Sequence, residues 1–194
     1  MRGERSEVRR DKCGGKGAFL RACSLPGSSL ALRVMLAFLL PLPAYLSPLA
    51  AQSASPGKVA KSIDRIFGSG VTIDTLKVDT SFVLRVSKTG TLLGFAQVRN
   101  VKGKDQPITY LVAITPANVL KDIDVLVYRE PYGGEVAYEP WRKQFRGKSA
   151  SAPLVVGKDI RNISGATISS HSVTLGVRKA LADLTAWHTS GRIR

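Results

Sequence analysis

Apolar and polar residues alternate between Thr72 and Tyr128, which is the pattern of β-strands. The alternation is clear from Phe82 to Val86, and it leads into an almost continuous apolar run over residues 110–114. Short turn signals interrupt the pattern; they are Thr89-Gly90, Lys102-Gly103-Lys104 and Pro116-Ala117-Asn118. Such connections are typical of a meander, so the sequence predicts a mostly antiparallel sheet.

Helical spacing appears on both sides of this region. Before it, apolar residues recur at Val59, Ile63, Ile66 and Phe67, and Gly68 supplies a stop signal. After it, from about residue 170, the apolar positions of a second helix are Val173, Val177, Ala180, Leu181 and Leu184. The fold class that follows is α+β: a mostly antiparallel sheet with an N-terminal helix and a long C-terminal helix packed against it.

The amino terminus has the composition of an export signal. Scattered basic residues are followed by an apolar stretch over residues 34–51, which ends in small residues before Gln52. We therefore expect a signal peptide over residues 1–51, a linker over 52–58 and one domain over 59–194. A membrane anchor is the alternative, but it needs about 20 apolar residues, and Pro41, Pro43 and Pro48 interrupt this stretch.

The positions of the two cysteines limit the kinds of site that the mature chain can form. Cys13 and Cys23 both lie in the predicted signal peptide, so the mature chain would have no disulfide, thiolate metal site, iron–sulfur cluster or c-type haem. His171 and His188 are too few for a metal site, and we expect them at the surface of the last helix. A redox role would then require an organic cofactor.

Positive charge persists after the predicted cleavage. Residues 52–194 hold 21 lysines and arginines against 11 aspartates and glutamates. The basic residues do not cluster with aromatic residues, and an exported chain rarely meets nucleic acid. The charge therefore favours a protein partner or a membrane surface over nucleic acid.

The stretch Ile163–Ser170 carries the most specific chemical signal. It places the hydroxyl group of Thr167 after Gly165 and Ala166, at the apparent start of the last helix. Small residues let a ligand approach the backbone, and the N–H groups and dipole at a helix start favour an anion such as phosphate. The alternative is a plain helix start, with Thr167 or Ser169 as the capping residue.

Ser164-Gly165-Ala166-Thr167 resembles the signature of the FMN-binding domain family, and further segments follow in the family's order. Leu93–Ala96, Tyr110–Ile114 and Ile123–Val127 are similar to its strands, Glu130–Glu135 to its Glu-Thr-Pro-Gly-x-Gly turn, and Trp141–Lys148 to its Gln-Phe-x-Gly-Lys element. The family includes the C subunit of the sodium-translocating NADH:quinone reductase and the G subunit of the Rnf complex. The resemblance covers about Thr72 to Leu184.

The resemblance implies that Thr167 carries FMN through a phosphodiester bond, made by a separate flavin transferase. Neighbouring serines would bind phosphate or ribityl oxygens, and the glycines of the Glu130 turn would let the backbone lie close to the ring; a wide turn is the alternative interpretation. The cofactor-binding residues so implied are Ser164, Gly165, Ala166, Thr167, Ile168, Ser169, Ser170, Glu130, Gly133 and Gly134. Trp141 and Phe145 are expected in the core and not against the flavin.

The sequence departs from the family at two places. Flavinylated members commonly have aspartate six residues before the modified threonine, where this chain has Arg161, with Asp159 two residues earlier. In the turn, Pro131 replaces threonine and Glu135 replaces the last glycine. The first departure concerns the covalent bond more than FMN binding.

Three functions remain open at this point. The first is an exported FMN-binding electron carrier, periplasmic or membrane-associated, that works with a membrane-bound redox complex. The second is a flavin-dependent reductase of a small acceptor, and the third is a binding or sensor domain that has lost the flavin. The sequence has no Gly-x-Ser-x-Gly element to suggest a hydrolase.

Overall fold

The computed structural model describes residues 54–194. The predicted signal peptide, both cysteines and the first two residues of the predicted linker lie outside the described residues. In the described part, no helix is both long enough and apolar enough to cross a membrane.

Five strands form one antiparallel sheet in sequence order, β1-β2-β3-β4-β5. The elements are α1 (Pro56–Phe67), β1 (Thr72–Val78), β2 (Ser81–Lys88), β3 (Thr91–Lys102), β4 (Pro107–Ile114), β5 (Leu120–Val127), η2 (Gly134–Ala137), α2 (Glu139–Arg142), η3 (Lys143–Phe145) and α3 (Thr167–Thr189). The predicted α+β class and meander are confirmed, because each of the three predicted turns lies where one strand leads into the next.

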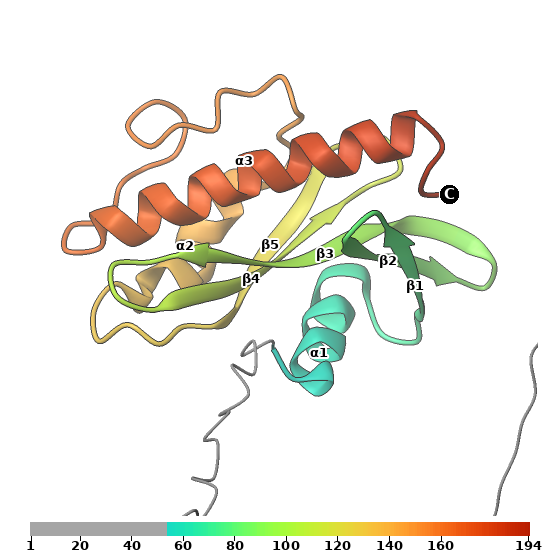
Figure 1. Cartoon of the computed structure of the whole chain (residues 1–194), viewed down its shortest axis with the longest axis horizontal. Helices are drawn as coiled ribbons and strands as arrows, with labels where there is room; N and C mark the ends of the chain where they lie inside the picture. Colours follow the sequence, from blue (N-terminus) through green and yellow to red (C-terminus); the bar gives the residue numbers. More distant parts are fainter. Residues whose placement is uncertain (1–53) are drawn as a thin grey trace, which may run out of the picture. The chain divides into compact units, whose positions relative to one another are not determined.

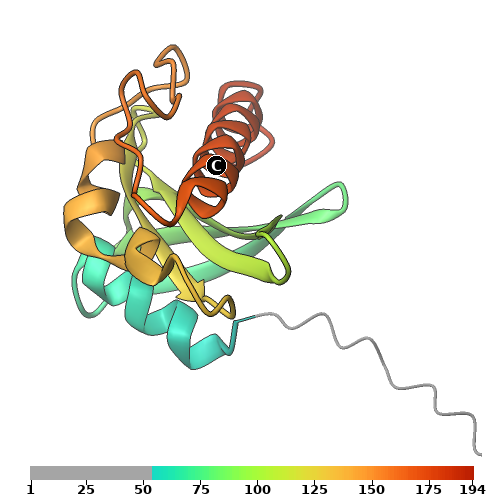
Figure 2. The same ribbon diagram turned by 90° about the vertical axis from the view of Figure 1, so that its left-hand side faces the viewer.

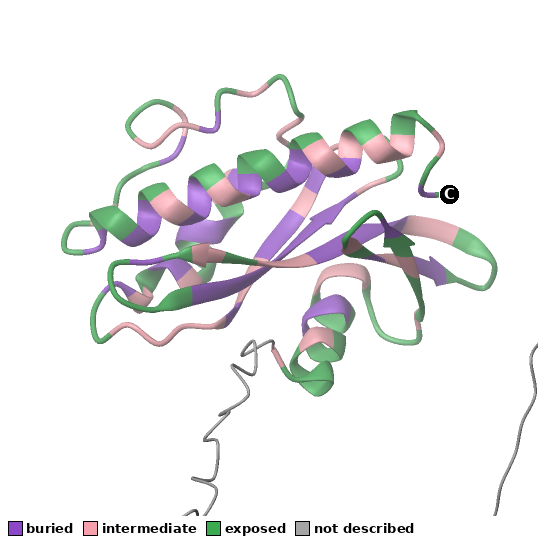
Figure 3. Ribbon diagram, viewed as in Figure 1, coloured by how far each residue is buried: buried purple, intermediate pink, exposed green. Residues whose placement is uncertain are grey.

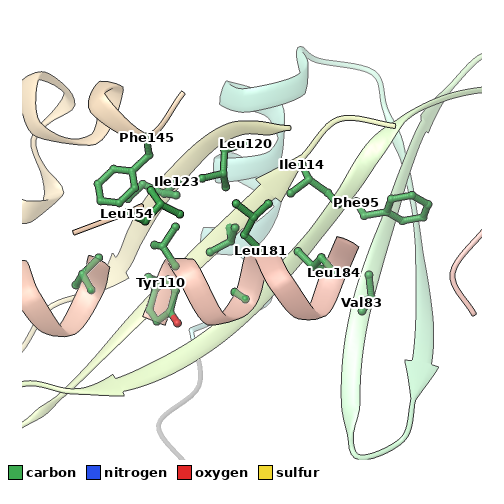
Figure 4. Packing of buried hydrophobic residues seen from close by; sticks show 14 of the residues in the cluster. Val83, Phe95, Tyr110, Ile114, Leu120, Ile123, Phe145, Leu154, Leu181 and Leu184 are labelled. Atoms are coloured by element: carbon green, nitrogen blue, oxygen red, sulfur yellow. The ribbon is translucent and has the colours of Figure 1, made fainter. Parts of the chain in front are cut away.

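The two long helices cover opposite faces of the sheet (Figures 1 and 2). One apolar cluster joins α3 to residues such as Val83, Phe95 and Tyr110, and Figure 4 shows their side chains between α3 and the strands. A second cluster surrounds Ile63 of α1 on the other face. Because both faces of the sheet are covered, every residue of β4 after Pro107 is buried, which accounts for the continuous apolar run in the sequence (Figure 3).

The same double cover changes the predicted pattern of β2. Val83 and Val86 are both fully buried, one in the cluster under α3 and the other in the cluster under α1. Phe82, which the alternation grouped with Val86, is 60% exposed. The alternating pattern therefore predicted the strand but not which of its residues are buried. Their burial depends on how far each helix extends over the sheet.

Two expectations about the helices need correction. Helix α1 begins at Pro56, within the predicted linker, because proline suits the first turn of a helix. Helix α3 begins at Thr167, as its expected place at the start of the last helix implies, although its apolar spacing is readable only from about residue 170. His188 is not a plain surface residue, since its ring packs 4.9 Å from that of Phe95 and its Nδ1 lies 2.8 Å from Oδ1 of Asn118.

Glycine at position 176 lets α3 approach the sheet. A Cβ atom there would lie 2.5 Å from the hydroxyl oxygen of Tyr110, which is buried in β4. Burial raises the pKa of Tyr110 to about 12, so the phenol stays neutral in the core. Trp141 and Phe145 are also buried, with ring centroids 5.1 Å apart, which confirms their predicted place in the core.

Asp122 of β5 links α1 to the segment from α2 to η3. Its Oδ2 accepts hydrogen bonds from Arg65 Nη1 and Arg146 Nη2, both at 2.9 Å, and Arg142 Nη1 lies 4.0 Å away. Burial opposes ionisation of this carboxyl, but the hydrogen bonds from Arg146, Arg65 and the Ile123 N–H outweigh it and lower its pKa. The ionised aspartate therefore stabilises the folded state.

Replacing Asp122 with asparagine is expected to lower the free energy of unfolding by about 3 kcal/mol at neutral pH, because buried Arg142 loses part of its compensating charge. A pKa that is lowered on folding contributes stability above the ordinary value of 3.8, and this is lost as the pH falls through the folded value. Urea unfolding of wild type and variant should therefore converge at acid pH. The exposed pair Asp74–Arg85 gives the control, since Asp74→Asn should cost less than about 1 kcal/mol; equal losses would contradict the prediction.

Candidate functional site

A pocket of about 400 Å³ lies where three segments distant in the sequence meet. They are the β3–β4 turn, the segment after β5 and the start of α3, all at the left end of Figure 1. The lining residues are Lys104, Asp105, Glu130, Pro131, Tyr132, Gly165, Ala166, Thr167, Ile168 and Ser169. The structure thus brings the predicted phosphate element and the predicted ring-contacting turn to one pocket.

The amino end of α3 faces this pocket without a side-chain cap. Ala166 occupies the N-cap position, and neither Thr167 nor Ser169 makes a capping hydrogen bond. The backbone bond that closes the first turn runs from the Ser170 N–H to the Ala166 carbonyl, 2.9 Å. The preceding N–H groups of the helix have no partner within it, so they and the helix dipole favour an anion. The alternative of a plain hydroxyl-capped helix does not describe this end.

Thr167 is exposed at the helix start and lines the pocket. Its Oγ1 accepts a hydrogen bond from Asn162 Nδ2 at 3.1 Å, which leaves the hydroxyl proton free. Asn162 precedes the Ser-Gly-Ala-Thr element, and no sequence pattern indicated its role. Its amide orients the oxygen that the family resemblance assigns to flavin attachment.

Ser169 has a different environment. Its Oγ lies 2.9 Å from the Tyr128 hydroxyl, and Tyr128 donates its own proton to the Tyr132 carbonyl. A phenol has one proton, so Ser169 is the donor to Tyr128 in this chain of hydrogen bonds. Burial raises the pKa of Tyr128, which keeps that proton in place. The chain of hydrogen bonds joins α3 to the segment after β5.

Gly133 lies between these two segments, behind the pocket lining. Its φ is +91°, and a Cβ atom there would lie 2.6 Å from Tyr128 Oη, 3.0 Å from Ala166 Cβ and 3.2 Å from Ser169 Oγ. Only a residue without a side chain permits this close approach. Gly165 also has a positive φ of +81°, but a Cβ atom there would meet nothing within 4 Å. The two glycines therefore have different roles, one in close contact and one in an open turn.

Glu130 organises the opposite wall of the pocket. Its Oε1 accepts hydrogen bonds from the backbone N–H groups of Asp105 and Gln106, at 2.8 and 2.9 Å. The bond from Gln106 is the largest cause of the lowered pKa of Glu130. The carboxylate thereby fixes the β3–β4 turn, which carries Lys104 into the pocket lining. The sequence predicted the β3–β4 turn but not its hydrogen bonds to Glu130, because the two segments are far apart in the chain.

Besides Gly133, which packs behind the lining, three residues predicted to bind the cofactor do not line the pocket. Ser164 is exposed, Gly134 would bring an added Cβ atom no closer than 3.8 Å to the Tyr128 ring, and Ser170 is fully buried. Ser170 Oγ has no hydrogen-bond partner in the described part of the chain. Their roles toward a cofactor stay predictions.

Asp159 does not take the place of the missing aspartate near Thr167. It pairs with Lys148 at 2.9 Å and accepts backbone N–H groups of Leu154 and Val155. Burial opposes its ionisation, and these bonds outweigh burial and lower its pKa. Asp159 thus shapes the connection between η3 and α3. The backbone of Arg161 makes two hydrogen bonds to side chains. Its N–H donates to Gln144 Oε1, and its carbonyl accepts from Trp141 Nε1.

A family model described as the FMN-binding domain matches residues 103–182. That segment contains every residue of the pocket lining. Residues 103–182 are thus similar to the FMN-binding domain. The predicted resemblance to the FMN-binding domain family is therefore confirmed.

A curated relative of this chain is the G subunit of the proton-translocating ferredoxin:NAD(+) oxidoreductase complex from Clostridium ljungdahlii. It is 35% identical over 98 residues, which cover 47% of this chain and 52% of the relative. The chain thus matches about half the length of that relative. A solved structure, NqrC from Shewanella oneidensis, aligns with a TM-score of 0.42 and 22% identity over 59% of this chain and 70% of that one.

The residues around the pocket fit the cofactor that the name of the matched family implies. The pocket volume lies within the range of about 300–1,000 Å³ for small-molecule sites. Uncapped N–H groups and Lys104 suit a phosphate or another electron-rich group, and the close contact at Gly133 holds the start of α3 beside the segment after β5.

Proposed function

We propose that this chain is an exported electron-transfer protein that carries FMN in the pocket at the start of α3 and works with a membrane-bound redox complex. The observation that carries the proposal is the meeting, around one pocket, of the Thr167 element, the Glu130 turn and the β3–β4 turn. When bound, the flavin would supply one- and two-electron chemistry that no side chain of the described residues provides.

In this proposal the segments around the pocket have different roles. The N–H groups at the start of α3 bind the phosphate, and Thr167 Oγ1, oriented by Asn162, holds it covalently after the action of a flavin transferase. Glu130 keeps the β3–β4 turn in place, so Lys104 stands at the pocket. None of these groups acts as a general acid or base, which favours an electron carrier over a stand-alone reductase.

The proposal of a membrane-bound partner rests on charge and on the relative. The matched relative is named as a subunit of a ferredoxin:NAD(+) oxidoreductase complex. The basic balance of residues 52–194 suits an acidic protein or a membrane surface. Export, by way of the predicted signal peptide, would place the domain in the periplasm or an equivalent compartment.

The test is to express the full chain in an exporting host together with a flavin transferase and to isolate the secreted or membrane fraction. We expect a yellow protein whose intact mass reports cleavage near residue 51 and one added FMN group, retained after denaturation and gel filtration. A colourless protein would favour the sensor function. A yellow protein that turns over a small acceptor without any partner would favour the reductase.

A further inference from the structure

Tyr132 stands at the mouth of the pocket with its backbone fixed and its side chain free. Its carbonyl accepts the Tyr128 hydroxyl, and it precedes Gly133, which packs behind the lining. The residue is nevertheless 81% exposed, the largest exposed fraction among the exposed large hydrophobic residues of the described part. An aromatic ring held at a pocket and left uncovered is available to a ligand.

The two ends of the pocket differ in chemistry. The α3 end offers N–H groups and hydroxyls, which suit a phosphate. The opposite end is lined by Lys104, Asp105, Glu130, Pro131 and Tyr132. Tyr132 is the aromatic residue of that lining, and Pro131 is its other apolar side chain. A ligand anchored by phosphate at α3 would therefore place its flat ring system beside Tyr132.

We propose that Tyr132 stacks on one face of the flavin ring and sets its electronic properties, an inference that rests on the proposed FMN site. An electron-rich ring stacks more favourably on the electron-poor oxidised flavin than on the electron-rich reduced flavin. Tyr132 therefore lowers the midpoint potential of the cofactor and quenches its fluorescence.

The experiment compares flavin-loaded wild type with Tyr132→Ala and Tyr132→Phe, produced in the same exporting host with the transferase. Fluorescence is measured per bound flavin, with the flavin quantified by absorbance after denaturation. We expect Tyr132→Ala to raise the fluorescence several-fold and to shift the midpoint potential upward. Tyr132→Phe should also be more fluorescent than wild type, because a phenyl ring donates electrons less readily than a phenol. Its flavin should stay as protected from iodide quenching as in wild type, because the phenyl ring still covers it.

Tyr138→Ala is the matched control. Tyr138 is 64% exposed and caps α2 without lining the pocket, so its loss should leave both readouts unchanged. Wild-type fluorescence in both loaded Tyr132 variants would overturn the stacking role while leaving the FMN site intact. If Tyr132→Ala loses its flavin, the fluorescence of flavin-loaded Tyr132→Phe alone tests the stacking role. A wild-type protein that binds no flavin would overturn the proposed function itself.

Discussion

Replacing Thr167 with valine is expected to abolish the covalent flavin completely and to leave the fold intact. Valine keeps the shape of threonine but lacks the oxygen that would bond to the phosphate. Thr167 is exposed at the first position of α3, and its side chain accepts one hydrogen bond, from Asn162, so the free energy of unfolding should change by no more than about 0.5 kcal/mol. Intact-mass measurement after denaturation checks the loss of one FMN group.

Two controls separate attachment from a general effect of the substitution. Thr189→Val changes the same residue type at the exposed far end of α3 and should keep the full adduct mass. Thr167→Ser retains a hydroxyl group and should keep at least part of the adduct. An adduct that persists in Thr167→Val would place the covalent bond elsewhere and remove the central element of the proposed site.

Replacing Gly133 with alanine is expected to lower both stability and flavin retention. At φ +91° an L-residue costs about 1–2 kcal/mol in backbone strain. The new methyl group would also lie 2.6 Å from Tyr128 Oη and 3.0 Å from Ala166 Cβ, which forces α3 away from the segment after β5. We expect a loss of about 2–4 kcal/mol in the free energy of unfolding and a much lower flavin-to-protein ratio, measured by urea unfolding and by absorbance.

Gly165→Ala is the matched control for this contact. Its φ of +81° gives a similar backbone cost, but the added Cβ atom meets nothing within 4 Å. The difference between the two variants therefore isolates the close approach at Gly133. Gly57→Ala, in the first turn of α1 and also without neighbours, should be neutral or slightly stabilising. Equal stability and equal flavin content in Gly133→Ala and Gly165→Ala would contradict the proposed role of the close contact at Gly133.

Much of the fold could be predicted because its signals are local. The turn at Thr89-Gly90 illustrates this, since both residues have positive φ, as a tight hairpin requires, and both strands beside it were predicted from alternation. The stop at Gly68 likewise follows from one residue with φ +95°. The start of α1 was less accurate, because it depends on Pro56 in the first turn rather than on apolar spacing.

The sequence by itself determined the α+β class, the order of the strands and the segment most suited to hold a phosphate, because each of these depends on residues close together in the chain. Only the tertiary structure decided what surrounds that segment. Glu130 bonds to the turn at residues 105–106, Gly133 lies against Ala166, and Tyr132 and Lys104 line the same pocket. These contacts join segments that are far apart in the chain. The spacing of apolar residues does not predict them, because the packing of the whole sheet and its helices determines which side chains meet.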